Sequence, residues 1–164
     1  MAHTVFISST YIDLIEHRAA VTQALLNAGF HPVDMVHFMA RPVDATTACL
    51  KEVADSDLFV GIYAWRYGYI PENNDFGITE QEFLEARRLK KLCFCFVIDE
   101  NHPWPDKKRD TGINKRLLTE FKIRLGKILV HAVFTTPEDL ALKVLASLQR
   151  WKTEEKNEKT KHKI

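Results

Sequence analysis

The sequence predicts a flavodoxin-like α/β fold, in which five parallel strands in the order 2-1-3-4-5 carry helices on both faces. Apolar runs of strand length alternate with amphipathic helical stretches along the 164 residues, and no segment repeats. This length fits one domain, and a hydrophobic fraction of 46% is enough to bury a core. In such a sheet, ligands bind beyond the carboxyl ends of the first and third strands, where the strand order reverses.

The first half of the chain is expected to contain three strands and two helices. The strands are residues 5–8, the weaker 32–36, and the buried run 58–63. One face of the first helix is formed by residues spaced by four, three, four and three, namely Leu14, Arg18, Val21, Leu25 and Ala28. Asp13 and Glu16 can cap its start and Gly29 its end. The second helix is expected over residues 47–54.

The second half continues the alternation. A helix is expected over residues 79–90, a strand over 92–98, a helix around Leu117 to Leu125, and a strand over 128–134. The motif Thr136-Pro137-Glu138-Asp139 combines a cap, a proline at the first helical position and acids in the first turn, and so predicts one more helix. We expect a domain over residues 1–151, followed by a frayed or solvated polar tail over residues 152–164.

The composition excludes several classes of function. The formal net charge of +1 gives no basic excess for nucleic acid. The longest apolar run, residues 92–98, is far shorter than the ~20 residues of a membrane span, and the N-terminus lacks a signal-peptide pattern. The cysteines and histidines lack metal-ligand spacing, so no metal is expected. A reduced, cytoplasmic setting is the simplest interpretation.

Other chemistries of this fold class lack their residues here. A receiver domain needs carboxylates after the first and third strands, where this chain has Ser8-Ser9 and Ala64-Trp65. No glycine-rich loop follows the first strand, so neither a Rossmann nor a Walker phosphate site is expected.

Two stretches of the sequence have an unusual pattern. Residues 5–18 read VFISSTYIDLIEHR, and residues 56–68 read SDLFVGIYAWRYG, followed at residues 77–86 by GITEQEFLEA. Together they resemble the TIR-like family of unknown function that is often found at the N-termini of STAND-type signalling ATPases. The family usually has a glutamate where this chain has His17, and commonly a glycine near Ala64.

The resemblance implies a candidate catalytic residue. The wider TIR superfamily includes enzymes that cleave NAD, and Glu82 matches the position of their catalytic glutamate. The segment 77–82 also resembles the nucleophile segment of nucleoside deoxyribosyltransferases. Nicotinamide leaves NAD as a neutral base, so one carboxylate can suffice, without the acid–base pair that most glycosidases need. The resemblance therefore implies NAD as a substrate, with no separate cofactor.

Glu82 also has a purely structural interpretation. Thr79 and Glu82 are spaced as a capping box, in which the glutamate reaches back to the threonine amide. The spacing by itself favours the cap. When the resemblance is added, the sequence favours the cap and the catalytic role about equally. Glu80 lies in the same turn. It is expected either to be a surface acid that interacts favourably with the helix dipole, or to bind substrate.

The remaining candidates lie around the two loops at the expected site, which run from Ser8 to Tyr11 and from Ala64 to Tyr69. Arg18 is expected to brace the groove, with Asp13 and Thr79 as further scaffold residues. Seven residues around these loops carry hydroxyl groups, aromatic rings or a fixed charge. Each is expected either to contact substrate or to have only a turn or packing role: Ser8, Ser9, Thr10, Phe38, Trp65, Arg66 and Tyr67.

The resemblance also implies partners. In TIR domains the loop after the second strand gates the site and mediates self-association, and here that loop runs from His37 to Pro42. We therefore expect a homo-oligomer that activates cleavage of NAD or a related nucleotide, in innate immunity or antiphage defence, beside a STAND-type ATPase or another defence protein. Two alternatives stay open: a non-catalytic interaction module, and a nucleoside or nucleotide base hydrolase or transferase.

Overall fold

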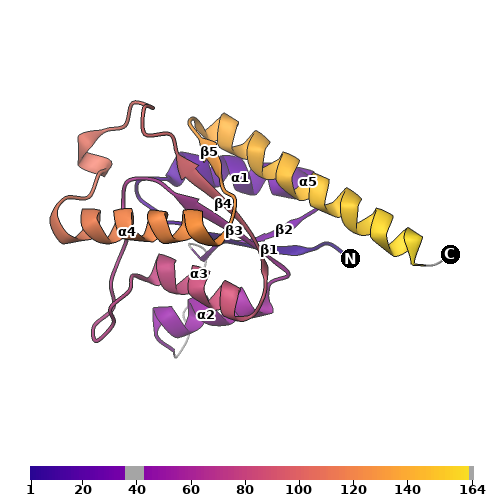
Figure 1. The fold of residues 1–164 in the computed structure, drawn as a ribbon, viewed down its shortest axis with the longest axis horizontal. Coiled ribbons are helices and arrows are strands. Elements are labelled where there is room, and N and C mark those ends of the chain that lie inside the picture. The colour runs from indigo at the N-terminus through magenta and orange to yellow at the C-terminus, as the bar shows by residue number, and fades with distance from the viewer. Residues whose placement is uncertain (36–42, 163–164) are drawn as a thin grey trace.

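The computed structural model describes residues 1–35 and 43–162, and shows a parallel sheet between two layers of helices (Figure 1). The strand order is β2-β1-β3-β4-β5, which confirms the flavodoxin-like prediction. The strands are β1 (Thr4–Ser8), β2 (His31–Val33), β3 (Leu58–Tyr63), β4 (Leu92–Ile98) and β5 (Ala132–Phe134).

The register of the sheet brings the ends of β1 and β3 together. Ser8, the last residue of β1, lies opposite Gly61 of β3. Because the two strands are parallel, the loops that follow them leave the same edge of the sheet. Any site at this edge is therefore built from the loop after β1 and the loop after β3.

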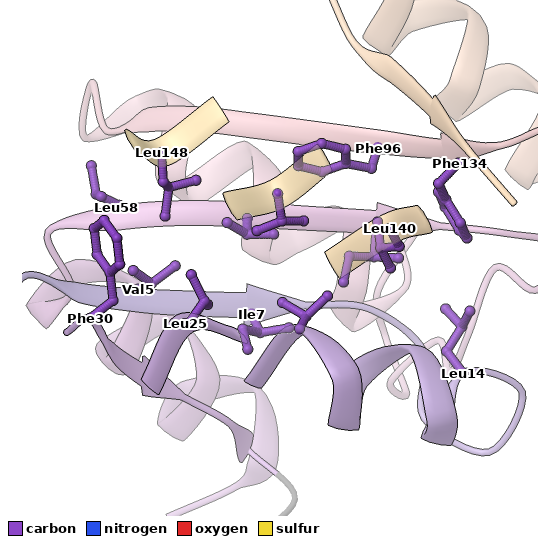
Figure 2. Close-up of a cluster of buried hydrophobic side chains, with 14 of the residues drawn as sticks. Val5, Ile7, Leu14, Leu25, Phe30, Leu58, Phe96, Phe134, Leu140 and Leu148 are labelled. Atoms are coloured by element: carbon purple, nitrogen blue, oxygen red, sulfur yellow. The ribbon is translucent and has the colours of Figure 1, made fainter. Parts of the chain in front are cut away.

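Helices bury a hydrophobic core on each face of the sheet. They are α1 (Ile15–Asn27), α2 (Ala45–Asp55), α3 (Ile78–Arg88), α4 (Gly112–Ile128) and α5 (Pro137–Lys161), with a short 3-10 helix, η2 (Asp106–Lys108). On one face, Leu25 of α1 and Leu140 and Leu148 of α5 pack on Val5 and Phe96 of the strands (Figure 2). On the other face, Val53, Phe83 and Phe121 join α2, α3 and α4 to the sheet.

The helix ends agree only in part with the predicted caps. Thr136 caps α5 as expected, because its Oγ1 accepts a hydrogen bond from the Asp139 amide at 3.1 Å. Gly29 follows α1 at a φ of +81°, a conformation that glycine adopts without strain. The predicted cap of α1 by Asp13 and Glu16 is wrong, since the residue before this helix is Leu14 and it makes no side-chain cap.

The capping box at Thr79 and Glu82 is also not formed. Helix α3 begins at Ile78, so Thr79 already lies inside its first turn. The preceding residue is Gly77, which has no side chain to cap with. The structural interpretation of Glu82 as a capping partner is therefore wrong.

The C-terminal region is more helical than expected. Helix α4 extends to Ile128, which leaves only Ala132–Phe134 for β5. Helix α5 continues to Lys161, so residues 152–161 are an exposed helix and not a frayed end. Ion pairs one turn apart support it, with 2.9 Å between Arg150 Nε and Glu154 Oε1 and 2.9 Å between Lys159 Nζ and Glu155 Oε1. Among the described residues, no helix combines the length and the apolar character needed to cross a bilayer.

We predict that Gly61→Ala destabilises the fold. A Cβ at position 61 would lie 2.7 Å from Cζ of Tyr63, and closer still to the hydroxyl oxygen of that ring. Tyr63 is buried and stacks edge-on against Phe121, so it has little room to move. Overpacking of this kind costs about 1–3 kcal/mol, which lowers the melting temperature by roughly 2–12 °C.

A matched control is Gly126→Ala in α4, where the nearest atom to the new Cβ is 3.7 Å away in His131. This change should be neutral, or should stabilise the helix by up to about 1 kcal/mol. Thermal melts of both variants check the prediction. A G61A melting temperature equal to that of the parent would mean that the Tyr63 ring moves freely.

Candidate functional site

A cavity of about 660 Å³ opens at the carboxyl ends of β1 and β3. The loop after β1, the loop after β3 and the first turns of α3 supply most of its wall. Residues singled out from the sequence line it: Ser9, Thr10, Asp13, Arg18, Arg66, Thr79 and Glu82. The point of strand-order reversal is therefore hollow in this chain, as ligand sites of this fold class are.

Glu82 is a buried acid in the wall of this cavity. Only 5% of the residue is exposed, and its carboxyl group makes no hydrogen bond or ion pair of ordinary length with the described residues. Burial raises the pKa of Glu82 to about 8, while the charge of Arg18 and the hydroxyl of Ser8 act in the opposite direction. An acid with a pKa near neutrality in a cavity is typical of catalytic groups.

Arg18 braces the cavity from the first turn of α1. Its guanidinium donates to Ser9 Oγ at 2.5 Å and to the Ser9 carbonyl oxygen at 3.4 Å, and it forms an ion pair with Asp34 just after β2. Arg18 thus contacts strand-end backbone and an acid, as a residue that braces the groove is expected to do. Because 4% of Arg18 is exposed, this is a buried charge that fixes the ends of β1 and β2.

Asp13 is a second buried acid in the same wall. It is 3% exposed, and neither carboxyl oxygen has a hydrogen-bond partner of ordinary geometry in the described chain. Burial raises its pKa, and the Thr10 side chain and the charge of Arg66 lower it. Arg66 is itself shared with Asp110, since Arg66 Nε lies 3.6 Å from Asp110 Oδ1.

Glu80 does not line this cavity, so the expectation that it contacts substrate there is wrong. Its carboxylate accepts a hydrogen bond from the Tyr67 hydroxyl at 2.5 Å and pairs with Arg124 of α4. Glu80 precedes Glu82 by two residues, which is about 200° around the helix, so the two acids point to different sides of α3. Tyr67 is buried beside Glu80, so the expectation that its ring contacts substrate is also wrong.

Two more candidates lie elsewhere. Ser8 is fully buried behind the cavity wall, and its hydroxyl has no partner of ordinary geometry in the described residues. Trp65 lines a different cavity, beside α4, so the expectation that it contacts substrate at the same site as Glu82 is wrong. Phe38 and the loop 37–42 lie outside the described residues.

The cavity also contains residues that sequence reasoning did not select. Cys49 comes from α2, Tyr69 from the loop after β3, and Asn114 from α4. No local pattern marks Cys49 or Asn114, because they reach the cavity only through the packing of distant elements, whereas Tyr69 lies in the loop after β3, where the site was expected. His17 lies elsewhere: its Nε2 is 3.0 Å from the Thr135 carbonyl oxygen, and burial lowers its pKa.

Comparison with known protein families identifies the family of this chain. Residues 4–149 match the model of a domain of unknown function, DUF4062. The chain belongs to this family. No curated protein matches the sequence. Within the described residues, no group of His, Cys, Asp and Glu side chains is placed to hold a metal ion.

Solved structures share the fold at low sequence identity. A CMP N-glycosidase from Clostridium botulinum is 13% identical, with a TM-score of 0.51, over 86% of this chain and 96% of that one. The TIR domains of the activated Roq1 resistosome are 15% identical, with a TM-score of 0.49, over 76% of this chain and 74% of that one. A flavoprotein from Thermotoga maritima is 20% identical, with a TM-score of 0.49, over 92% of this chain and 35% of that one. At these identities, the likeness shows the fold alone.

We predict that Glu82 makes the stability of the protein depend on pH. The unfolded chain loses the Glu82 proton near pH 4.5, while the folded protein keeps it to about pH 8. The stabilisation from this group is therefore fully present below pH 4.5 and is lost as the pH rises toward 8, by up to about 1.4 kcal/mol per pH unit.

Urea unfolding of the parent and of Glu82→Gln across this pH range measures the effect. Because glutamine does not titrate, the variant should gain stability relative to the parent as the pH rises. A difference between the two proteins that is constant with pH would show that Glu82 is ionised at an ordinary pKa.

Proposed function

We propose that this chain is an N-glycosidase that releases nicotinamide from NAD, with Glu82 as its catalytic carboxylate. The observation that supports this most is the buried carboxyl group of Glu82, with its raised pKa, in a cavity at the point of strand-order reversal. The match of Glu82 to the catalytic position of TIR-type NAD-cleaving enzymes points to the same reaction. A fold shared with a CMP N-glycosidase is compatible with it.

The proposed reaction needs only one acidic side chain. The bond between the ribose and the pyridinium nitrogen breaks, and its electron pair stays on the nitrogen, so nicotinamide leaves neutral. A water oxygen forms the new bond to the ribose carbon, and the water proton passes to solvent. The Glu82 carboxylate would stabilise the positive charge that develops on the ribose.

The raised pKa of Glu82 fits a cationic substrate. Before substrate binds, the acid is mostly protonated at neutral pH, because burial favours the uncharged form. A pyridinium cation beside it would favour the carboxylate and lower this pKa. Substrate binding would thus ionise the group when it is needed.

We predict that Glu82→Gln lowers NAD cleavage at least about 100-fold, since it removes the negative charge but keeps the shape. The matched control is Glu85→Gln, one turn further along α3. Glu85 is outside the cavity wall and bonds to Arg88, with Nε to Oε2 at 2.8 Å. Nicotinamide release, followed by chromatography with purified protein, is the measurement.

The outcomes separate catalysis from a structural role. Loss of activity in E82Q alone, with both variants folded by thermal melting, supports the proposal. Equal activity in E82Q and the parent would remove Glu82 from catalysis. A parent protein that releases no base from NAD or from any nucleotide would favour the interaction-module alternative.

Asp13 favours a second candidate, the cleavage of nucleosides or nucleotides. Their neutral bases must be protonated to leave, which requires an acid besides Glu82. Asp13 lines the same cavity, and burial favours its protonated form. Its oxygens are closed off from solvent, so the Asp13 side chain would have to turn toward the cavity to protonate a leaving base.

We predict that Asp13→Asn separates the two substrate classes. If Asp13 supplies a proton, the variant loses cleavage of nucleoside monophosphates by about 100-fold, but keeps NAD cleavage within a few-fold. Parallel assays of base release from NAD, CMP and AMP test this. Equal losses on all substrates would assign Asp13 to the scaffold of the site.

Self-association belongs to the same proposal. A homo-oligomer that contacts the loop 37–42 would complete the open side of the cavity, with Phe38 as a contact residue. Work beside a STAND-type ATPase or another defence protein follows from the resemblance, and so does a part in innate immunity or antiphage defence.

A further inference from the structure

A second cavity, of about 500 Å³, lies between α4 and the segments that follow β3 and β4. Its wall includes Trp65, Glu100, Arg109, Asp110, Lys122 and His131. It is a separate space from the Glu82 cavity, although Asp110 in its wall forms an ion pair with Arg66 in the wall of the first.

Two cations lie on the indole ring of Trp65. The Arg109 guanidinium carbon is 4.5 Å from the ring centroid, and Lys122 Nζ is also 4.5 Å from it. Such contacts hold cations at an aromatic face. The indole Nε1 is buried and has no hydrogen-bond partner within the described chain. Because this nitrogen is closed off from solvent, the ring holds two positive groups at the cavity wall but offers the cavity no donor of its own.

The cavity wall carries three cationic side chains, Arg109, Lys115 and Lys122, against two carboxylates, Glu100 and Asp110. Asp110 is already engaged, since it accepts a hydrogen bond from the Tyr67 amide at 2.7 Å and pairs with Arg66. In the part of the chain that is described, no carboxylate lies within 4.0 Å of Lys122 Nζ. Burial lowers the pKa of Lys122 to about 8, Glu100 opposes this shift and Arg109 adds to it. Lys122 thus lacks a close negative partner.

Arg109 has N–H donors that make no hydrogen bond with the described residues. Its Nε donates to the Trp104 carbonyl oxygen at 3.4 Å and lies 3.9 Å from the fully exposed Asp106. Its two terminal nitrogens make no hydrogen bond to any described residue. A guanidinium and an ammonium group in the wall of one cavity suit an oxyanion with several acceptor oxygens.

We propose that this second cavity binds the phosphate group of a small phosphorylated molecule, with Lys122 and Arg109 as its cationic ligands. Phosphate offers the negative charge that Lys122 lacks nearby, and enough acceptor oxygens for Lys122 and Arg109 together. A volume of about 500 Å³ leaves room for an organic part beside the apolar side chains of Val97 and Ile123. This site is independent of the proposed reaction at Glu82.

The test is calorimetric titration of the full chain with inorganic phosphate and with ribose 5-phosphate, at matched ionic strength in sodium chloride. We expect saturable binding of at least one ligand, weakened at least about tenfold by Lys122→Met. The matched control is Lys127→Met, because Lys127 is an exposed lysine of α4 outside this cavity. Tighter binding of the ester would identify the organic part as a contact, and tighter binding of inorganic phosphate would assign the cavity to the free ion.

A second readout uses the parent protein, so it does not depend on the folding of a variant. Acetylation by acetic anhydride at pH 8, followed by mass spectrometry, reports the reactivity of each lysine. Phosphate should slow labelling of Lys122 and leave Lys127 unchanged. No saturable binding of either ligand, or protection of both lysines alike, would overturn the proposal.

Discussion

The buried guanidinium of Arg18 is the group on which the architecture of the candidate site depends. It ties α1 to the end of β1 through Ser9 and to the end of β2 through Asp34. A buried charge without partners would cost several kcal/mol, so these contacts must form together as the domain folds. They set the positions of the first two strand ends and place a positive charge near Glu82. The cavity and the acid in its wall thus share one organising contact.

Helix α3 shows how one short segment serves two needs. Glu82 faces the cavity, where the Arg18 charge and the Ser8 hydroxyl act on it, whereas Glu80 faces α4 and is held by Tyr67 and Arg124. The second acid fastens the helix on which the first is carried. This arrangement matters because an acid in a cavity wall needs a rigid support if its position is to be fixed.

The segment after β3 distributes three neighbouring side chains to three places. Trp65 enters the second cavity, Arg66 borders the first, and Tyr67 turns into the core beside Glu80. Asp110, which follows η2, accepts a hydrogen bond from the Tyr67 amide and pairs with Arg66. The loop is therefore fixed by a residue more than forty positions away. This fixing lets one loop supply walls to two separate cavities.

The sequence by itself determined the fold class, the strand order and the edge at which the site lies, because periodicity and the alternation of strands and helices are local properties. It also marked Glu82 and Arg18 through motifs. Only the tertiary structure decided that Thr79 and Glu82 form no capping box, that Glu80 turns away, and that Trp65 belongs to another cavity. The starting residue of α3 sets the first of these, and the partners of each side chain set the others. Both depend on packing between segments far apart in the chain, such as the pairing of Glu80 with Arg124, which no local pattern of residues encodes.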